Sequence, residues 1–292
     1  MKPIQLKARG RCGMLVLIAL ALAGCSPLRT FDALMPKDAG SARLVSDIAY
    51  GPDPRQRLDI YAPTSRRGRA LPVIVFFYGG SWNSGTKAGY AFVGRALAAQ
   101  GFLVVIPDYR LVPQVRYPAF LEDSARAVRW VRQDAAAYGG DPDRLVLAGH
   151  SAGAYNAAML ALDPRWLGAD RRAVRGFIGL AGPYDFLPFS GAVVDAAFGG
   201  TADPHSTQPI TYAGSDSPPA LLATGARDTM VLPRNSDALA AALRAHGVAV
   251  ERRVYPGVGH VGLITAVAQP FRGRAPVLTD ITVFARRVTE GA

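Results

Sequence analysis

The chain has 292 residues, half of them hydrophobic, which suffices for one large domain with a sizeable core and excludes disorder over most of the length. Its formal net charge is +11 at pH 7, carried mostly by arginines that are spread along the sequence. Because these cations form no block and are not interleaved with aromatic residues, nucleic-acid binding is not expected.

Residues 1–24 resemble a bacterial lipoprotein signal peptide. Four cations precede an apolar run at residues 14–23, which is too short for a comfortable bilayer span and ends in Leu-Ala-Gly before Cys25. We therefore expect Cys25 to carry a lipid anchor and residues 25–42 to form a tether, with a transmembrane anchor as the alternative. The serine after this cysteine indicates the outer membrane of the cell envelope and a periplasm-facing domain. Since Cys12 leaves with the signal, the mature chain is expected to have no disulfide, thiol nucleophile or cysteine-ligated metal.

The rest of the chain alternates strand and helix patterns. Residues 45–50 and 57–61 alternate apolar and polar side chains around a Gly-Pro-Asp-Pro turn, which predicts a hairpin at a sheet edge. This alternation of elements predicts a mostly parallel sheet with helices on both faces. Residues 181–219 have no sustained period and are expected to form an irregular insert, acting as a lid or pocket wall. Further strands are predicted at residues 71–78, 102–106, 145–148, 174–180, 220–224 and 248–255, and helices at 88–100, 119–138, 154–162, 234–246 and 277–288.

One strand-to-helix junction carries a catalytic motif. The buried strand at residues 145–148 runs directly into Gly149-His150-Ser151-Ala152-Gly153, which is followed by a helical pattern of small apolar residues. A bare G-x-S-x-G is usually an ordinary turn, but these two flanks are the context of a nucleophile elbow. Ser151 is therefore the expected nucleophile. The backbone amide of Ala152, at the start of the helix, is an expected donor of an oxyanion hole.

A serine nucleophile needs a histidine to take its proton. Of the four histidines, His260 follows the last predicted strand in a glycine-rich loop at the carboxyl end of the sheet, where ligands gather in open α/β folds. His150 leaves the turn in another direction from the serine and is expected to be structural, whereas His246 ends a helix and His205 lies in the insert. We expect His260 to be the base.

The carboxylate that orients the base is expected between the serine and the histidine in chain order. Asp228 follows immediately after a buried strand, one strand before His260, and is the expected third member of the triad. Asp185, which follows the preceding strand, is the competing candidate.

The second oxyanion donor is expected in the glycine-rich loop after the strand at residues 71–78. The two glycines at 79 and 80 allow backbone amides to face a developing negative charge, so the amide of Gly80 or Ser81 is the predicted donor. Trp82, the next residue of the loop, is predicted to contact substrate.

In combination these motifs resemble the carboxylesterase branch of the α/β-hydrolase superfamily, whose oxyanion motif is of the HGGxW type. The nearest likeness is to bacterial BD-FAE-like and hormone-sensitive-lipase-like esterases, which show runs similar to Pro107-Asp108-Tyr109-Arg110. The resemblance extends from about residue 47 to the C-terminus. It implies an eight-stranded sheet, a Ser151–Asp228–His260 triad, no cofactor or metal, and hydrolysis of short-chain esters.

Tyr78 stands where that motif has its leading histidine, and we expect its hydroxyl to brace the loop. Asp108, Tyr109 and Arg110 are interpreted as an ion pair and packing rather than as substrate contacts. The expected function is a serine carboxylesterase that acts on small short-chain or aryl esters. The alternatives are an amide hydrolase of the arylformamidase or peptidase type, and a non-catalytic lipoprotein that uses the fold as a binding surface.

Overall fold

The computed structural model describes residues 27–65 and 68–290. The predicted signal peptide and the predicted lipidation site Cys25 lie outside the described residues. Within the two described ranges, no helix combines the length and the apolar character that crossing a bilayer requires.

A single eight-stranded sheet of order β1-β2-β4-β3-β5-β6-β7-β8 runs through the described part of the chain. β1 and β2 form the predicted edge hairpin, and β2 is also antiparallel to β4. From β4 onward all neighbours in the sheet are parallel, as predicted. The strands are β1 (Ser41–Ala49), β2 (Arg57–Pro63), β3 (Leu71–Phe77), β4 (Leu103–Pro107), β5 (Gly140–His150), β6 (Val174–Leu180), β7 (Ala220–Gly225) and β8 (Val250–Tyr255).

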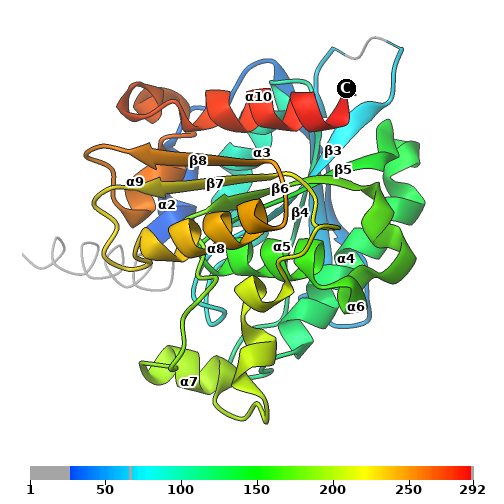
Figure 1. Ribbon diagram of the computed structural model, residues 1–292. Helices are drawn as coiled ribbons and strands as arrows, with labels where there is room; N and C mark the ends of the chain where they lie inside the picture. Colours follow the sequence, from blue (N-terminus) through cyan, green and yellow to red (C-terminus); the bar gives the residue numbers. More distant parts are fainter. Residues whose placement is uncertain (1–26, 66–67, 291–292) are drawn as a thin grey trace, which may run out of the picture.

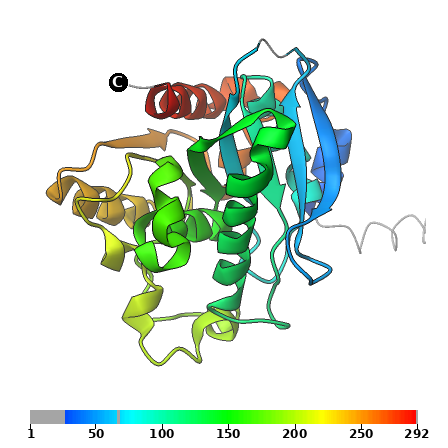
Figure 2. The same cartoon turned by 90° about the vertical axis from the view of Figure 1, so that its right-hand side faces the viewer.

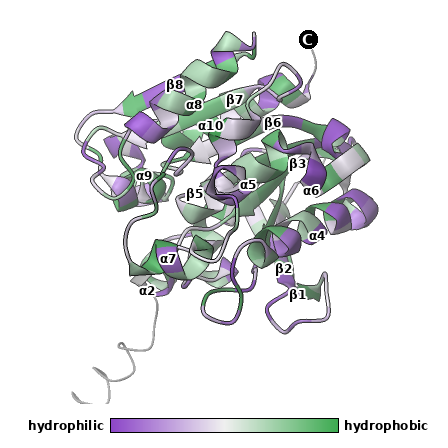
Figure 3. Cartoon of the chain, turned by 60° about the horizontal axis from the view of Figure 1, so that its bottom comes forward, coloured by the Kyte–Doolittle hydropathy of each residue, from purple (hydrophilic) through white to green (hydrophobic). Residues whose placement is uncertain are grey.

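The central strands are apolar on both faces because helices cover both. In β3, Ile74 and Phe76 enter one hydrophobic cluster while Val75 and Phe77 enter the other, as the two-residue period of a strand requires. α3 and α10 cover the first face, and α4, α5 and α8 the second (Figures 1 and 2). In Figure 3 the central strands are mostly green, whereas the outer helices α4 and α6 carry purple residues.

The α-helices are α2 (Pro27–Leu34), α3 (Ala91–Ala98), α4 (Ala119–Asp134), α5 (Ala152–Leu162), α6 (Pro164–Leu167), α7 (Ala192–Phe198), α8 (Arg234–Ala245), α9 (His260–Thr265) and α10 (Val277–Thr289). The 3₁₀ helices are η1 (Lys87–Tyr90), η2 (Ala135–Tyr138), η3 (Gly168–Ala173), η4 (Pro204–Thr207), η5 (Pro209–Tyr212) and η6 (Gln269–Arg274).

The start of the described chain corrects one prediction. Residues 27–34 form the helix α2, packed on the domain, so the expected tether is wrong for this part. Leu28 and Phe31 are three residues apart and so share one helix face, which packs against the core. The ring of Phe31 meets that of Phe92 edge-on at 5.2 Å, and the carboxylate of Asp32 accepts the Phe92 amide at 2.6 Å. The proline and polar residues of this segment suggested a linker, but the three-residue spacing of Leu28 and Phe31 lets the helix pack against the domain core.

The insert at residues 181–219 is held together by aromatic packing. It contains α7, η4 and η5, which lie below the sheet in Figure 1. The rings of Phe186, Phe189 and Phe198 lie 5.4 to 5.9 Å apart. These phenylalanines hold together a segment that has no sustained helical or strand period, and residues from its first half line the same cavity as Ser151.

Candidate active site

Ser151 occupies the strained turn between β5 and α5. Its backbone has φ 55° and ψ −123°, a conformation that a non-glycine residue adopts only when its surroundings impose it. A Cβ on Gly153 would lie 2.0 Å from the carbonyl oxygen of Phe77, and one on Gly149 would lie 2.2 Å from the carbonyl oxygen of Gly153. Strand and helix can therefore meet only because both positions are glycine. The turn has the geometry of a nucleophile elbow.

Asp228 and His260 come together from the loops that follow β7 and β8. Oδ2 of Asp228 lies 2.7 Å from Nδ1 of His260, and both side chains are buried. The other carboxylate oxygen accepts the backbone amides of Met230 and Val231, at 3.0 and 2.9 Å. These contacts fix the carboxylate, which in turn fixes the imidazole. Asp185 is exposed, and its carboxylate has no contact with His260.

Ser151 and His260 both line two cavities. The larger, of about 530 Å³, is lined mainly by apolar residues of the insert and of the β7–α8 loop. The second, of about 480 Å³, is lined by Leu28 and Phe31 of α2 and by the loop after β3. Ser151 therefore borders two cavities whose remaining walls come from different segments. In the described part of the chain, no group of three or more His, Cys, Asp or Glu residues is placed to hold a metal ion.

The loop after β3 passes directly beside the serine. A Cβ on Gly79 would lie 3.0 Å from the Cβ of Ser151. Gly80 and Ser81 both have positive φ, 134° and 51°, and a Cβ on Gly80 would lie 2.3 Å from the carbonyl oxygen of Ser84. Across the described residues, no protein acceptor is found for the backbone amides of Gly80, Ser81 or Ala152. These amides are free to stabilise an oxyanion.

Trp82 is a buried wall of the larger cavity. It is only 4% exposed, and its indole nitrogen donates to Oδ1 of Asn156 at 3.2 Å. Its ring lies edge-on against Phe198 at 4.8 Å. Little of the side chain is therefore available for the predicted substrate contact, and the indole N–H is not free for a substrate. Sequence reasoning missed Asn156, whose signal is an amide side chain within the apolar helix α5.

The Tyr78 hydroxyl braces the loop as predicted. It accepts a hydrogen bond from the guanidinium of Arg55 at 2.8 Å, and the same group donates to the carbonyl oxygen of Gly85 at 3.1 Å. The Tyr78 ring stacks on that of Tyr109 at 4.7 Å, and the Tyr109 hydroxyl donates to the Tyr78 carbonyl at 2.8 Å. Burial raises the pKa of the Tyr78 phenol far above its ordinary value, so it stays protonated. Arg55 thus ties the two ends of the loop together.

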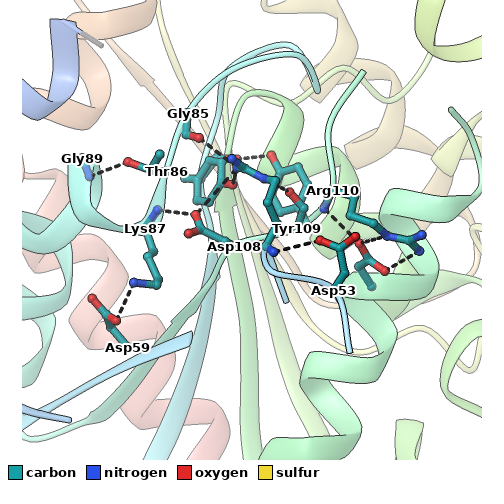
Figure 4. Close-up of polar contacts among 12 residues, drawn as sticks. Asp53, Asp59, Gly85, Thr86, Lys87, Gly89, Asp108, Tyr109 and Arg110 are labelled. Carbon is teal, nitrogen blue, oxygen red and sulfur yellow. Dashed lines mark hydrogen bonds and ion pairs between the residues drawn. The ribbon is translucent and has the colours of Figure 1, made fainter. Parts of the chain in front are cut away.

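Asp108 and Arg110 are structural, as interpreted from the sequence. Asp108 accepts the amide of Lys87 at 2.7 Å, and burial raises the pKa of its carboxyl group (Figure 4). Arg110 forms a two-pronged pair with the buried Asp123, at 2.7 and 2.8 Å. Neither residue lines either of the two cavities.

His150 is buried beside the candidate base and has a neutral imidazole. Its ring centre lies 4.9 Å from that of His260. Burial, with a smaller contribution from the neighbouring His260, lowers its pKa to about 3. Its structural role agrees with the sequence interpretation. His205 and His246 are exposed and line neither cavity.

Comparisons with known proteins agree with this geometry. The model of the BD-FAE family matches residues 58–243. The chain is 32% identical over 240 residues to Esterase LipC from Mycobacterium tuberculosis, covering 73% of this chain and 58% of that protein. It is 29% identical over 264 residues to Isoprenylcysteine alpha-carbonyl methylesterase ICME from Arabidopsis thaliana, covering 82% and 61%. The chain thus spans less than two thirds of either relative. Among solved structures, Esterase B from Lactobacillus rhamnosis superposes with a TM-score of 0.80 at 22% identity, covering 95% of this chain and 96% of that one, which shows the fold.

Proposed function

The chain belongs to the BD-FAE family, and from that membership and the geometry of the site we propose that it is a serine carboxylesterase for short-chain or aryl esters. One observation carries the proposal. A serine on a strained elbow opens into the same cavities as a histidine whose second ring nitrogen is held by a buried aspartate. That arrangement supports acyl transfer through a covalent intermediate.

The first half of the reaction transfers the acyl group to the enzyme. Ser151 attacks the ester carbonyl carbon while Nε2 of His260 takes the hydroxyl proton. Asp228, hydrogen-bonded to Nδ1, stabilises the imidazolium that forms. The carbonyl oxygen becomes an oxyanion, which accepts hydrogen bonds from the amide of Ala152 and from that of Gly80 or Ser81. When the C–O bond breaks, His260 returns the proton to the leaving alcohol.

The second half releases the acid. Water donates a proton to His260 and attacks the acyl carbon, and the same amides stabilise the second oxyanion. The bond to the Ser151 oxygen then breaks, and the serine takes the proton back from His260. Every atom and proton in this cycle comes from the ester, from water or from this chain, so the proposal needs no cofactor.

The two cavities support a preference for apolar substituents. The acyl and alcohol parts of an ester lie on opposite sides of the reacting carbonyl, and the two cavities that Ser151 lines are otherwise bounded by different segments of the chain. Apolar walls favour apolar ligand surface at roughly 25 cal/mol per Å² buried. The names of the two relatives, an esterase and a methylesterase, fit a small-molecule ester substrate for this chain as well.

We also propose that Cys25 carries a lipid anchor and that the domain faces the periplasm. The short apolar run and the Leu-Ala-Gly-Cys sequence support this. Membrane fractionation of cells that express the full chain and its Cys25→Ala variant tests it. The wild type is expected in the outer-membrane fraction, with incorporated palmitate. Equal palmitate labelling of the variant would overturn the proposal.

Active-site labelling and a substrate panel test the catalytic proposal. A fluorophosphonate probe should modify Ser151, and a Ser151→Ala variant should show no adduct. Hydrolysis of 4-nitrophenyl acetate should exceed that of N-formylkynurenine and of a short peptide. An adduct combined with preferential cleavage of either amide would favour the amide hydrolases. The absence of both an adduct and hydrolysis would favour a non-catalytic binding protein.

A further inference from the structure

The larger cavity contains an unusual charge distribution. Its walls are mostly apolar, with Phe186, Leu187, Val194 and Leu232 among them. Among the described residues, no aspartate or glutamate lines it, and Arg234 is its one permanently charged side chain. An ester that fills this cavity therefore meets a single cation and no anion.

Arg234 has no protein partner that would neutralise it. Among the described residues, no hydrogen bond or ion pair engages its side chain, whereas Arg252, which packs against the same helix, pairs with Asp237 at 2.8 Å. Asp185, the acid that follows β6, neither lines the cavity nor pairs with Arg234. As the first residue of α8, Arg234 also gains nothing from the helix dipole, which favours cations at the opposite end. Neither ion pairing nor helix stability accounts for an arginine here.

We propose that the larger cavity takes the part of the ester that carries a carboxylate, and that Arg234 pairs with it. The planar guanidinium matches a carboxylate through two parallel hydrogen bonds. One cation balances one singly charged group, which favours a carboxylate over a phosphate dianion. The remaining apolar wall then contacts the carbon chain or ring between the carboxylate and the ester. The substrate class is a carboxylated ester, such as the monoester of a dicarboxylic acid.

This inference rests on the proposed esterase function and adds its specificity. Because Arg234 is exposed to solvent, an ion pair with it is worth less than a buried one, and the expected preference is modest. We expect the carboxylate to raise kcat/KM about fivefold through Arg234, and the effect to shrink at high salt because the pair is open to screening.

Two matched substrate pairs measure this preference on the full chain. The mono-4-nitrophenyl ester of adipic acid is compared with its methylated, neutral counterpart, which places the charge on the acyl side. 4-Acetoxybenzoate is compared with 4-acetoxybenzamide, which places it on the alcohol side. The ratio of kcat/KM for the charged over the neutral member is the readout. The neutral member also reports whether each variant is folded and active.

Three variants test whether the charged-over-neutral ratio of kcat/KM depends on Arg234. Arg234→Gln should lower it about fivefold for the pair whose charged arm occupies the cavity, and Arg234→Lys should restore part of it. Arg227→Gln removes an equal charge from the β7–α8 loop outside the cavity and should leave the ratio unchanged. An equal ratio in wild type and Arg234→Gln for both pairs would overturn the inference while leaving the esterase proposal standing. Failure to hydrolyse any neutral ester would instead overturn the esterase proposal.

Discussion

Nε2 of His150 lies 3.3 Å from the carbonyl oxygen of His260, so the residue before the elbow serine contacts the backbone of the candidate base. Nδ1 of the same ring lies 3.0 Å from the hydroxyl of Tyr90, which accepts the amide of Gly79 at 3.1 Å. A neutral imidazole has one donor and one acceptor nitrogen. Tyr90 therefore donates to Nδ1, and Nε2–H donates to the carbonyl. One chain of hydrogen bonds joins the loop after β3 (residues 78–85), which we call the oxyanion loop, to His260.

Removing the Tyr90 hydroxyl should slow turnover without weakening substrate binding. In a Tyr90→Phe variant the Gly79 amide loses its acceptor and His150 loses the donor that fixes its tautomer. We expect kcat to fall about tenfold and KM to stay within about twofold, because the oxyanion donors and the base are misplaced while the cavity walls remain. Steady-state kinetics on 4-nitrophenyl acetate measure both values.

The matched control is Tyr212→Phe. The Tyr212 hydroxyl donates to the carbonyl of Ser206 at 2.8 Å, within the insert. Tyr212 lines neither of the two cavities. Its removal should leave kcat within about twofold of wild type. Equal losses in both variants would indicate a general effect of removing a hydroxyl and would contradict the positioning role of Tyr90.

The depressed pKa of His150 predicts acid sensitivity of the fold. The group titrates at about 3 in the folded chain and near 6.5 when unfolded, so between these values the unfolded state binds the additional proton. The free energy of unfolding should therefore increase with pH between about 3 and 6.5. As the pH falls below 6.5 it should decrease, by up to about 1.4 kcal/mol per pH unit. Urea unfolding at pH 4.5, 5.5 and 7 measures the slope. In His150→Gln the slope should be smaller, whatever the overall stability, and an unchanged slope would assign the acid sensitivity to other groups.

Exchanging the two candidate acids for asparagine should separate them. Asp228→Asn keeps the shape but offers His260 an amide instead of a carboxylate, which favours the wrong tautomer and should cost about three to four orders of magnitude in kcat. Asp185→Asn should change kcat by less than about threefold, since this exposed side chain lies outside both cavities. A large loss in Asp185→Asn together with a small one in Asp228→Asn would reverse the assignment.

The sheet and the three candidate catalytic residues could be predicted because local sequence specifies them. Apolar runs mark buried strands, and residues that follow parallel strands meet at one edge of a sheet. Ser151 and Asp228 follow the buried strands β5 and β7, and His260 follows the next parallel strand, β8, which is partly exposed at the sheet edge. Their order in the chain therefore sufficed to select them. The glycines at 149 and 153 are equally local, because they are needed where two adjoining elements meet.

The supports of the site could not be predicted because they are contacts between distant segments. Asn156 holds Trp82 across 74 positions, and Arg55 reaches Tyr78 and Gly85 from the edge hairpin. Asn156 is conspicuous in an apolar helix and Arg55 resembles an ordinary surface residue, but the sequence does not indicate the distant partner of either. The docking of α2 is similar, since it depends on rings that belong to α3 and η6. Tertiary packing, rather than local composition, decides these elements.

The contact between Arg55 and Tyr78 predicts energetic coupling between two residues outside the three candidate catalytic residues. Tyr78→Phe should leave the half-buried guanidinium without one acceptor, and Arg55→Met should leave the buried hydroxyl without its donor. Each change should lower the free energy of unfolding by about 1 to 2 kcal/mol. The double variant should lose less than the sum, by at least about 0.5 kcal/mol, because the second change removes a partner that is already lost.

Urea midpoints of the four proteins give this coupling, and kcat of the same four reports its effect on the oxyanion loop. Both single variants should lower kcat several-fold, since Arg55 ties Tyr78 to Gly85 at the two ends of the loop. A matched pair for comparison is Arg252→Met with Asp237→Asn, whose contact of 2.8 Å lies on α8 and β8 away from the loop. That pair should lower stability without a change in kcat beyond about twofold. Additive losses for Arg55 and Tyr78, with kcat unaffected, would mean that the hydroxyl packs against the guanidinium without bracing the loop.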